Sequence, residues 1–156
     1  MRVLAVDPGE KRIGIALSDP TGTIASPLLV LQHISRAVDA GVIAQIAHEH
    51  GVDLIIVGES LDEENLPTLQ SRRAARLANE IKRQADLPIQ LWDETGSTQA
   101  ARSARIAIGV RRSKRKGHMD DLAATVILQS YLESRREANL AKAIPEQTDT
   151  SMSSIS

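Results

Sequence analysis

The chain has 156 residues, a formal net charge of −1 and an apolar fraction of 42%, which together are typical of one globular domain. It has no Cys, and this excludes disulfides, thiol catalysis and cysteine-ligated zinc sites. No stretch approaches the roughly 18 consecutive apolar residues of a membrane-spanning helix. The apolar run at the N-terminus is too short for a signal peptide, so we expect a cytoplasmic protein.

The first part of the chain predicts an antiparallel meander. An apolar run at 2–7 ends in the sequence DPG, which is typical of a turn. Residues 12–19 alternate between large apolar side chains and small or polar ones, as a strand does. A third strand is expected at 23–32, where Pro27 favours a sheet edge or a bulge.

The second part alternates helices and strands. Ser35 is a predicted N-cap, and Gly51 marks the end of the helix that follows it. The apolar run at 53–58 is typical of a strand buried on both faces of a parallel sheet. Further elements are predicted as helices at 68–85, 97–105 and 119–137, a strand at 89–93 and a basic loop at 108–118. We therefore expect an α/β fold whose single five-stranded mixed sheet has strands 1–3 antiparallel and strands 1, 4 and 5 parallel.

The C-terminal segment is rich in Ser and Thr and has few apolar residues to bury. Such a composition favours disorder, because too little apolar surface is available to offset the cost of ordering the chain. We therefore expect a domain at 1–137 and a disordered tail at 138–156.

Acidic residues end or begin several of these elements. In open α/β sheets, ligand sites lie at the carboxyl ends of the parallel strands. Two carboxylates about 4 Å apart repel by about 4 kcal/mol at an effective dielectric of roughly 20, and a hard divalent ion such as Mg²⁺ or Mn²⁺ removes that cost. Two such ions can promote cleavage of a phosphodiester bond by activating a water and stabilising the leaving oxygen. The acids at these positions are Asp7, Glu59, Asp93, Glu94, Asp120 and Asp121.

Each acid taken alone has a second interpretation. Asp7 fits a plain turn residue, and Asp120 or Asp121 fits a charge that complements a helix dipole. Glu59 begins an acidic loop, where solvation is the usual outcome. The convergence of three separate segments therefore carries the metal-site hypothesis.

The choice between Asp93 and Glu94 stays open. Strict alternation puts Gln90, Trp92 and Glu94 on one face of the strand and Asp93 on the other. Alternation often fails at strand ends, so either acid remains a candidate.

Positive charge is concentrated in one run. Residues Arg111, Arg112, Lys114, Arg115 and Lys116 are the natural contacts for phosphates, although a solvated surface loop is the commoner role of such a run. Lys11 and Arg12 add positive charge beside Asp7, and His118 is a weaker candidate for substrate contact. The chain has one Trp, one Tyr and no Phe, so recognition through the nucleic-acid backbone is expected rather than base stacking.

Four motifs resemble one known family. VDPGEKRIGIALSD, IIVGES, WDETGSTQAA and KGHMDDLAATVIL are similar to motifs of the YqgF/RuvX family, and the resemblance covers about residues 1–135. These are ribonuclease H-like proteins described as pre-16S rRNA nucleases and as Holliday junction resolvases. The resemblance implies a ribonuclease H-like fold and a metal-dependent nuclease acting on structured nucleic acid. At the matching positions the family's acids fall on Asp7, on the pair Asp93 and Glu94, and on Asp120. We predict that Asp7, Glu94 and Asp120 are catalytic and bind the metal.

The chain departs from the family pattern in three places. Gly58-Glu59-Ser60 stands where the family has Gly-Leu-Pro, and a Glu there resembles RuvC-type resolvases, which makes Glu59 a candidate fourth ligand. Asp121 stands where the family has Ser and is a candidate additional acid. The sequence TGST at 95–98 replaces Arg-Leu-Thr-Thr, which removes an Arg that would contact phosphate or support the fold.

The resemblance therefore leads to a hydrolase that processes the 5′ end of pre-16S rRNA in ribosome biogenesis. Holliday junction resolution is the alternative, and it requires a homodimer because two strands are cut symmetrically; a monomer and a homodimer both remain open. A catalytically inactive nucleic-acid-binding module is a third hypothesis. A nucleotide-binding fold of the actin type is disfavoured, because it needs two lobes and the chain is long enough for one.

Overall fold

The computed structural model describes residues 1–61, 64, 66–93 and 120–155, and in the last helix it describes side chains for 122–142. The helix predicted at 97–105 and the basic loop predicted at 108–118 lie outside these residues. Within the described ranges, no helix combines the length and apolarity needed to cross a membrane.

The described strands form one sheet with the order β3-β2-β1-β4-β5. Strand β1 pairs antiparallel with β2, which pairs antiparallel with β3. On its other side β1 pairs parallel with β4, which pairs parallel with β5. The predicted mixed sheet is therefore confirmed. The strands are β1 (Val3–Pro8), β2 (Arg12–Ser18), β3 (Ala25–Gln32), β4 (Leu54–Glu59) and β5 (Ile89–Asp93).

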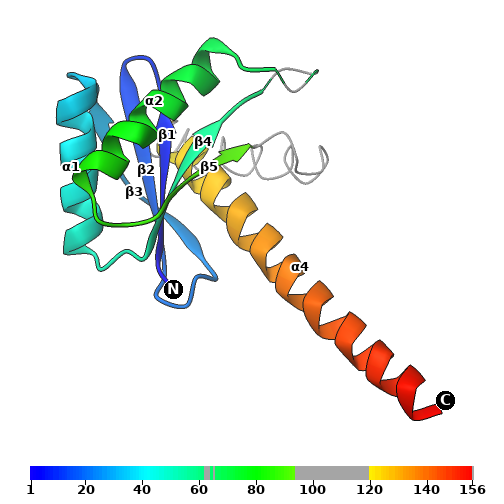
Figure 1. The fold of residues 1–156 in the computed structure, drawn as a ribbon. Helices are drawn as coiled ribbons and strands as arrows, with labels where there is room; N and C mark the ends of the chain where they lie inside the picture. The colour runs from blue at the N-terminus through cyan, green and yellow to red at the C-terminus, as the bar shows by residue number, and fades with distance from the viewer. Residues whose placement is uncertain (62–63, 65, 94–119, 156) are drawn as a thin grey trace.

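Helices cover both faces of the sheet (Figure 1). Helices α1 (Arg36–Glu49) and α2 (Leu69–Gln84) pack on one face, and α4 (Asp120–Ile155) crosses the other. Alternation along β1 divides its side chains between two cores: Leu4 and Val6 pack toward α1 and α2, whereas Val3 and Ala5 pack toward α4. The side that each strand residue faces can be read from these two cores.

Local signals set the element boundaries as expected. The hydroxyl of Ser35 accepts a hydrogen bond of 3.2 Å from the Val38 N–H, and Gly51 follows α1 with a φ of +63°. Pro27 lies in the edge strand β3, opposite the point between Ile15 and Ala16 where the register shifts. The expectations of an N-cap, a glycine stop and an edge or bulge proline are confirmed.

The last helix is longer than predicted. It was expected to end near residue 137, but α4 continues to Ile155. Its last buried side chain among those described is Leu132, and residues 134–142 are exposed. Residues 133–143 are rich in Ala, Leu, Arg and Glu, which have high helix propensity, and this favours helix past the point where packing ends. The domain limit at residue 137 remains a prediction.

Four strands end at one edge of the sheet, which we call the rim. Because β3 is antiparallel to β2 and β2 is antiparallel to β1, strands β1, β3, β4 and β5 all point the same way. Helices α1 and α2 follow β3 and β4 directly and therefore begin at the rim. The arrangement brings strand carboxyl ends and helix N-termini together on one side of the molecule.

Candidate active site at the rim

Asp7 lies at the rim end of β1 and is half-buried. The chain turns immediately after it, and a Cβ at Gly9 would lie 2.3 Å from the carbonyl oxygen of Arg12, so only glycine fits this turn. Val3 and Ala5 face α4, so alternation puts the Asp7 side chain on the α4 face as well. The tight turn and the buried strand together hold this carboxylate in one place.

The neighbouring strands carry glycines on this face. Gly14 on β2 is directly opposite Asp7, and Gly58 on β4 follows the pair formed by Val6 and Val57. A Cβ at Gly58 would lie 2.4 Å from Cδ1 of Ile127. Helix α4 therefore lies directly on β4 beside Asp7.

The direction of α4 places its first residue at the rim. Ile127 packs against Gly58 near the rim, whereas Arg135 donates a hydrogen bond of 3.5 Å to Sδ of Met1 at the far end of β1. The helix thus runs away from the rim, and Asp120 is its first residue. The structure brings Asp7 and the start of α4 to one face and one edge of the sheet. The side chains of Asp120 and Asp121 are not among those described.

Glu59 and Asp93 form a second acidic pair at the rim. They end β4 and β5 and are opposite each other in the parallel register. The pKa of Glu59 is raised above its ordinary value, mainly by burial and secondly by the nearby Asp93 carboxylate. Ile55 and Val57 pack toward α1 and α2, so alternation puts Glu59 and Asp93 on that face rather than on the face of Asp7. Their roles as ligands remain predictions.

Trp92 shows that alternation persists to the end of β5. Its Nε1 donates a hydrogen bond of 3.4 Å to Oγ of Ser130, and its ring meets Tyr131 edge-on with centroids 5.2 Å apart. Trp92 thus faces α4, and Asp93 does not. This pattern favours Glu94 over Asp93 as the partner of Asp7, but Glu94 lies outside the described residues and its role stays a prediction.

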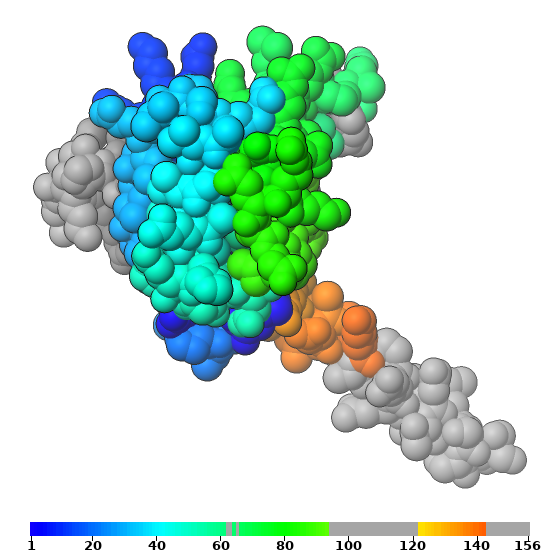
Figure 2. All heavy atoms as spheres, turned by 60° about the vertical axis from the view of Figure 1, so that its left-hand side comes forward, coloured from blue at the N-terminus to red at the C-terminus, as the bar shows by residue number. Residues whose placement is uncertain are grey.

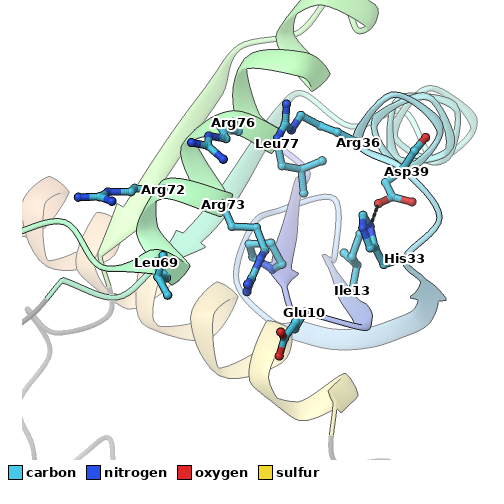
Figure 3. Close-up of a pocket in the computed structure, with 13 residues that line it drawn as sticks. Glu10, Ile13, His33, Arg36, Asp39, Leu69, Arg72, Arg73, Arg76 and Leu77 are labelled. Carbon is cyan, nitrogen blue, oxygen red and sulfur yellow. Dashed lines mark hydrogen bonds and ion pairs between the residues drawn. The ribbon is translucent and has the colours of Figure 1, made fainter.

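The basic residues divide between described and undescribed segments. Two exposed basic residues lie at the rim: Lys11 in the turn between β1 and β2, and Arg12 at the start of β2. The run at 111–116 and His118 lie outside the described residues. Sequence reasoning missed a further cluster at the same edge of the molecule. Its members are Arg36, Arg72, Arg73 and Arg76, which line a pocket between α1 and α2 (Figure 3).

The donor chemistry at Asp7 suits a hard cation. A half-buried carboxylate flanked by glycines offers oxygen ligands with little side-chain cover from the adjacent strands. Among the side chains that the structure describes, no three His, Asp or Glu residues form a group able to hold a metal ion. Of the three predicted ligands, only Asp7 has a described side chain.

The mixed sheet with α4 on one face and α1 and α2 on the other defines a ribonuclease H-like protein. RuvC from T. thermophilus, solved in complex with a Holliday junction substrate, matches this chain with a TM-score of 0.57 at 15% identity, over 87% of this chain and 96% of that chain. The fowlpox virus Holliday junction resolvase matches with a TM-score of 0.52 at 17% identity, over 86% of this chain and 99% of that chain. At these identities the two structures establish the fold.

Sequence comparison identifies the family. The family model described as "RuvX: Holliday junction resolvase" matches residues 1–134. A relative from Desulforamulus reducens named "Putative pre-16S rRNA nuclease" is 40% identical over 134 residues, which are 86% of this chain and 98% of the relative. The chain belongs to the RuvX family, and the resemblance drawn from the motifs is confirmed. Membership places it among hydrolases that act on nucleic acids.

Proposed function

We propose that this protein is a divalent-metal-dependent nuclease that processes the 5′ end of pre-16S rRNA in the cytoplasm. The observation that carries the proposal is the position of Asp7. Its carboxylate is held at the rim by a turn that only glycine permits, on the sheet face where α4 begins with Asp120. Carboxylates fixed on separate rigid elements are what a phosphodiester-cleaving metal site requires.

Asp7, Glu94 and Asp120 are the proposed metal ligands. Asp120 precedes Ala124 and Ile127, which pack on the sheet, by four and seven residues, and this helical spacing is the reason for proposing it as a ligand. Mg²⁺ or Mn²⁺ at this site would supply an activated water and stabilise the leaving oxygen. Asp93, Asp121 and Glu59 are secondary candidates for the metal site. Glu59 and Asp93 lie on the face of the sheet that α1 and α2 cover, which favours an indirect role for them over direct binding of the metal.

Phosphate contacts are proposed for the basic residues near this edge. Lys11, in the turn after Asp7, and Arg12, at the start of β2, are exposed. Arg111, Arg112, Lys114, Arg115 and Lys116 supply the largest local excess of positive charge in the sequence. Such contacts hold the backbone of a substrate without reading its sequence.

The name of the D. reducens relative favours ribosomal RNA as the substrate. The description of the family model, and the two structures that share the fold, support four-way DNA junctions as the second candidate. Symmetric cutting of a junction requires two active sites, so the second function requires a homodimer, whereas a monomer suffices for RNA processing. An inactive binding module is the remaining alternative.

Cleavage of two labelled substrates tests the proposal. An RNA containing the 5′ region of pre-16S rRNA and a four-way DNA junction are incubated with Mg²⁺ or Mn²⁺ and with wild type, Asp7→Asn or Asp86→Asn. Asp86 precedes β5 at the end of the sheet opposite the rim and serves as the matched control. We expect metal-dependent cleavage of the RNA by wild type and by Asp86→Asn, and none by Asp7→Asn.

A thermal shift measurement separates a failed site from a failed fold. Mn²⁺ should raise the melting temperature of wild type and raise that of Asp7→Asn much less, because a ligand stabilises only the state that binds it. Equal cleavage by wild type and Asp7→Asn would refute the catalytic role of Asp7. Cleavage of the junction but not of the RNA would favour Holliday junction resolution over rRNA processing. Metal binding without cleavage of either substrate would favour the inactive module.

A further inference from the structure

The arginine pocket lies on the opposite face of the sheet from the Asp7 side chain. It has a volume of about 380 Å³ and is formed by the turn after β1, the start of α1 and the first turns of α2 (Figure 3). Figure 2 shows α1 and α2 side by side on this face, with side chains of the turn between β1 and β2 projecting beyond them. Pro8, Gly9 and Glu10 line the pocket and directly follow Asp7 in the chain. The pocket and the candidate active site are therefore joined by one turn at the rim.

Positive charge dominates this pocket. Arg36 comes from α1, and Arg72, Arg73 and Arg76 come from α2, where their spacing groups them on one side of the helix. In the part of the chain that the structure describes, none of these four guanidinium groups makes a hydrogen bond or an ion pair. Figure 3 shows Arg73 directed toward the turn that carries Glu10, while Arg36 reaches from α1 toward α2.

The acids in the pocket do not neutralise the arginines. Asp39 is 3% exposed, and its carboxylate is held by Nδ1 of His33 at 2.5 Å and by the Ile34 N–H at 3.1 Å. The Asp39 carboxylate therefore already has hydrogen-bond partners just before α1. Glu10 is exposed on the turn and is the other acid among the described lining residues. Four cations against these two acids leave a net positive pocket.

Arg36 also occupies a position that disfavours a base within its own helix. Arg36 is the first residue of α1, Arg72 and Arg73 lie just beyond the first turn of α2, and the first turn of α2 has no acid. A helix N-terminus carries partial positive charge and is stabilised by acids rather than by bases. Two helix N-termini and four guanidinium groups thus direct the same sign of charge at one cavity, and an anion relieves the repulsion among them.

Phosphate is the anion that this chemistry fits. The planar fork of arginine pairs with phosphate oxygens through two parallel hydrogen bonds. The described lining residues include no Phe, Tyr or Trp on which a base would stack. We propose that the arginine pocket binds a backbone phosphate of the nucleic-acid substrate, on the strand that passes over the rim from the Asp7 site. This inference rests on the proposed function for the identity of the polyanion.

Binding measurements in a cleavage-deficient background test the inference. All proteins carry Asp7→Asn so that the labelled RNA and the junction stay intact, and affinity is measured by fluorescence anisotropy at several salt concentrations. The pocket variant is Arg36→Gln with Arg73→Gln. The matched control is Lys82→Gln with Arg83→Gln, which removes the same charge at the far end of α2.

The pocket variant should bind the RNA at least about tenfold more weakly, because charge-assisted hydrogen bonds are lost. Its plot of log affinity against log salt should be shallower by about 0.7–0.9, since the pocket holds one phosphate and that one contact is lost. The control should change affinity less than about threefold. Arg73→Lys, which keeps the charge and loses the fork, should have an affinity between that of the Asp7→Asn protein with the intact pocket and that of the pocket variant.

Equal affinities of the pocket variant and the control would overturn the inference, provided that their melting temperatures match. Thermal shifts with inorganic phosphate and with a nucleoside monophosphate form the second arm. Tight binding of either, with unchanged affinity for RNA and junction, would assign the pocket to a small phosphate ligand and overturn the nucleic-acid assignment. If wild type cleaves and the pocket variant binds normally, only this inference fails. If the Asp7→Asn protein with the intact pocket binds through it and wild type cleaves nothing, only the proposed function fails.

Discussion

Substitution of Gly58 by Ala should move α4 away from the sheet beside the candidate active site. The new Cβ would lie 2.4 Å from Cδ1 of Ile127, and 3.2 and 3.4 Å from its Cγ1 and Cγ2. Ile127 is 3% exposed and has little room to move. Overpacking of this kind lowers the free energy of unfolding by about 1–3 kcal/mol. Because α4 also carries Asp120, the rate of cleavage should fall as well.

The partner variant Ile127→Val removes the Cδ1 atom and should by itself cost about 0.5–1.5 kcal/mol. With Cδ1 gone, the closest approach to the new Cβ becomes 3.2 Å, which small shifts accommodate. The double variant should therefore be more stable than the sum of the two single effects predicts, by about 1 kcal/mol or more. Cleavage by the double variant should recover in part.

Urea unfolding followed by fluorescence measures these free energies, because Trp92 is the only Trp and contacts α4. Gly41→Ala in α1 is the matched control. Its Cβ would meet only the end of the Gln84 side chain, at 3.0 Å, and alanine favours the helix by about 0.8–1 kcal/mol. We expect this control to be neutral or stabilising. Strictly additive effects of Gly58→Ala and Ile127→Val would refute the contact between β4 and α4 on which the placement of Asp120 depends.

Two further predictions concern charge and capping. Burial and the Asp93 carboxylate raise the pKa of Glu59, so the folded state retains a proton that the unfolded chain releases. The free energy of unfolding therefore falls as the pH rises from the ordinary pKa range of Glu through the raised pKa of Glu59. Glu59→Gln should thus be more stable than wild type at pH 7 in urea unfolding, and the gain should shrink below pH 4. Glu137→Gln, at an exposed position, is the control, and a loss of stability in Glu59→Gln at pH 7 would contradict the cause given. Ser35→Ala should lower stability by about 0.5–2 kcal/mol because the Val38 N–H loses its acceptor, and Ser35→Asp should retain the cap; equal loss in both variants would argue against capping.

The local features of the fold were predictable because short-range physics determines them. Alternation identified β2, and the cap at Ser35 and the glycine at 51 bounded α1. An apolar run of strand length identified β4 as buried on both faces. The end of α4 was predicted wrongly, because packing was the signal used to end the helix, and the run at 133–143, rich in Ala, Leu, Arg and Glu, favours helix beyond the last packed residue.

For the candidate site, the sequence by itself determined that acids end strands β1, β4 and β5 and that an acid begins the last helix, because each depends only on neighbours in the chain. Which acids share a face was decided by the tertiary structure, which puts Asp7 beneath α4 and turns Glu59 and Asp93 to the other side. The arginine pocket could likewise not be predicted from the sequence. Arg36 and Arg73 are far apart along the chain, and only the packing of α1 beside α2 at the rim brings their charges to one cavity.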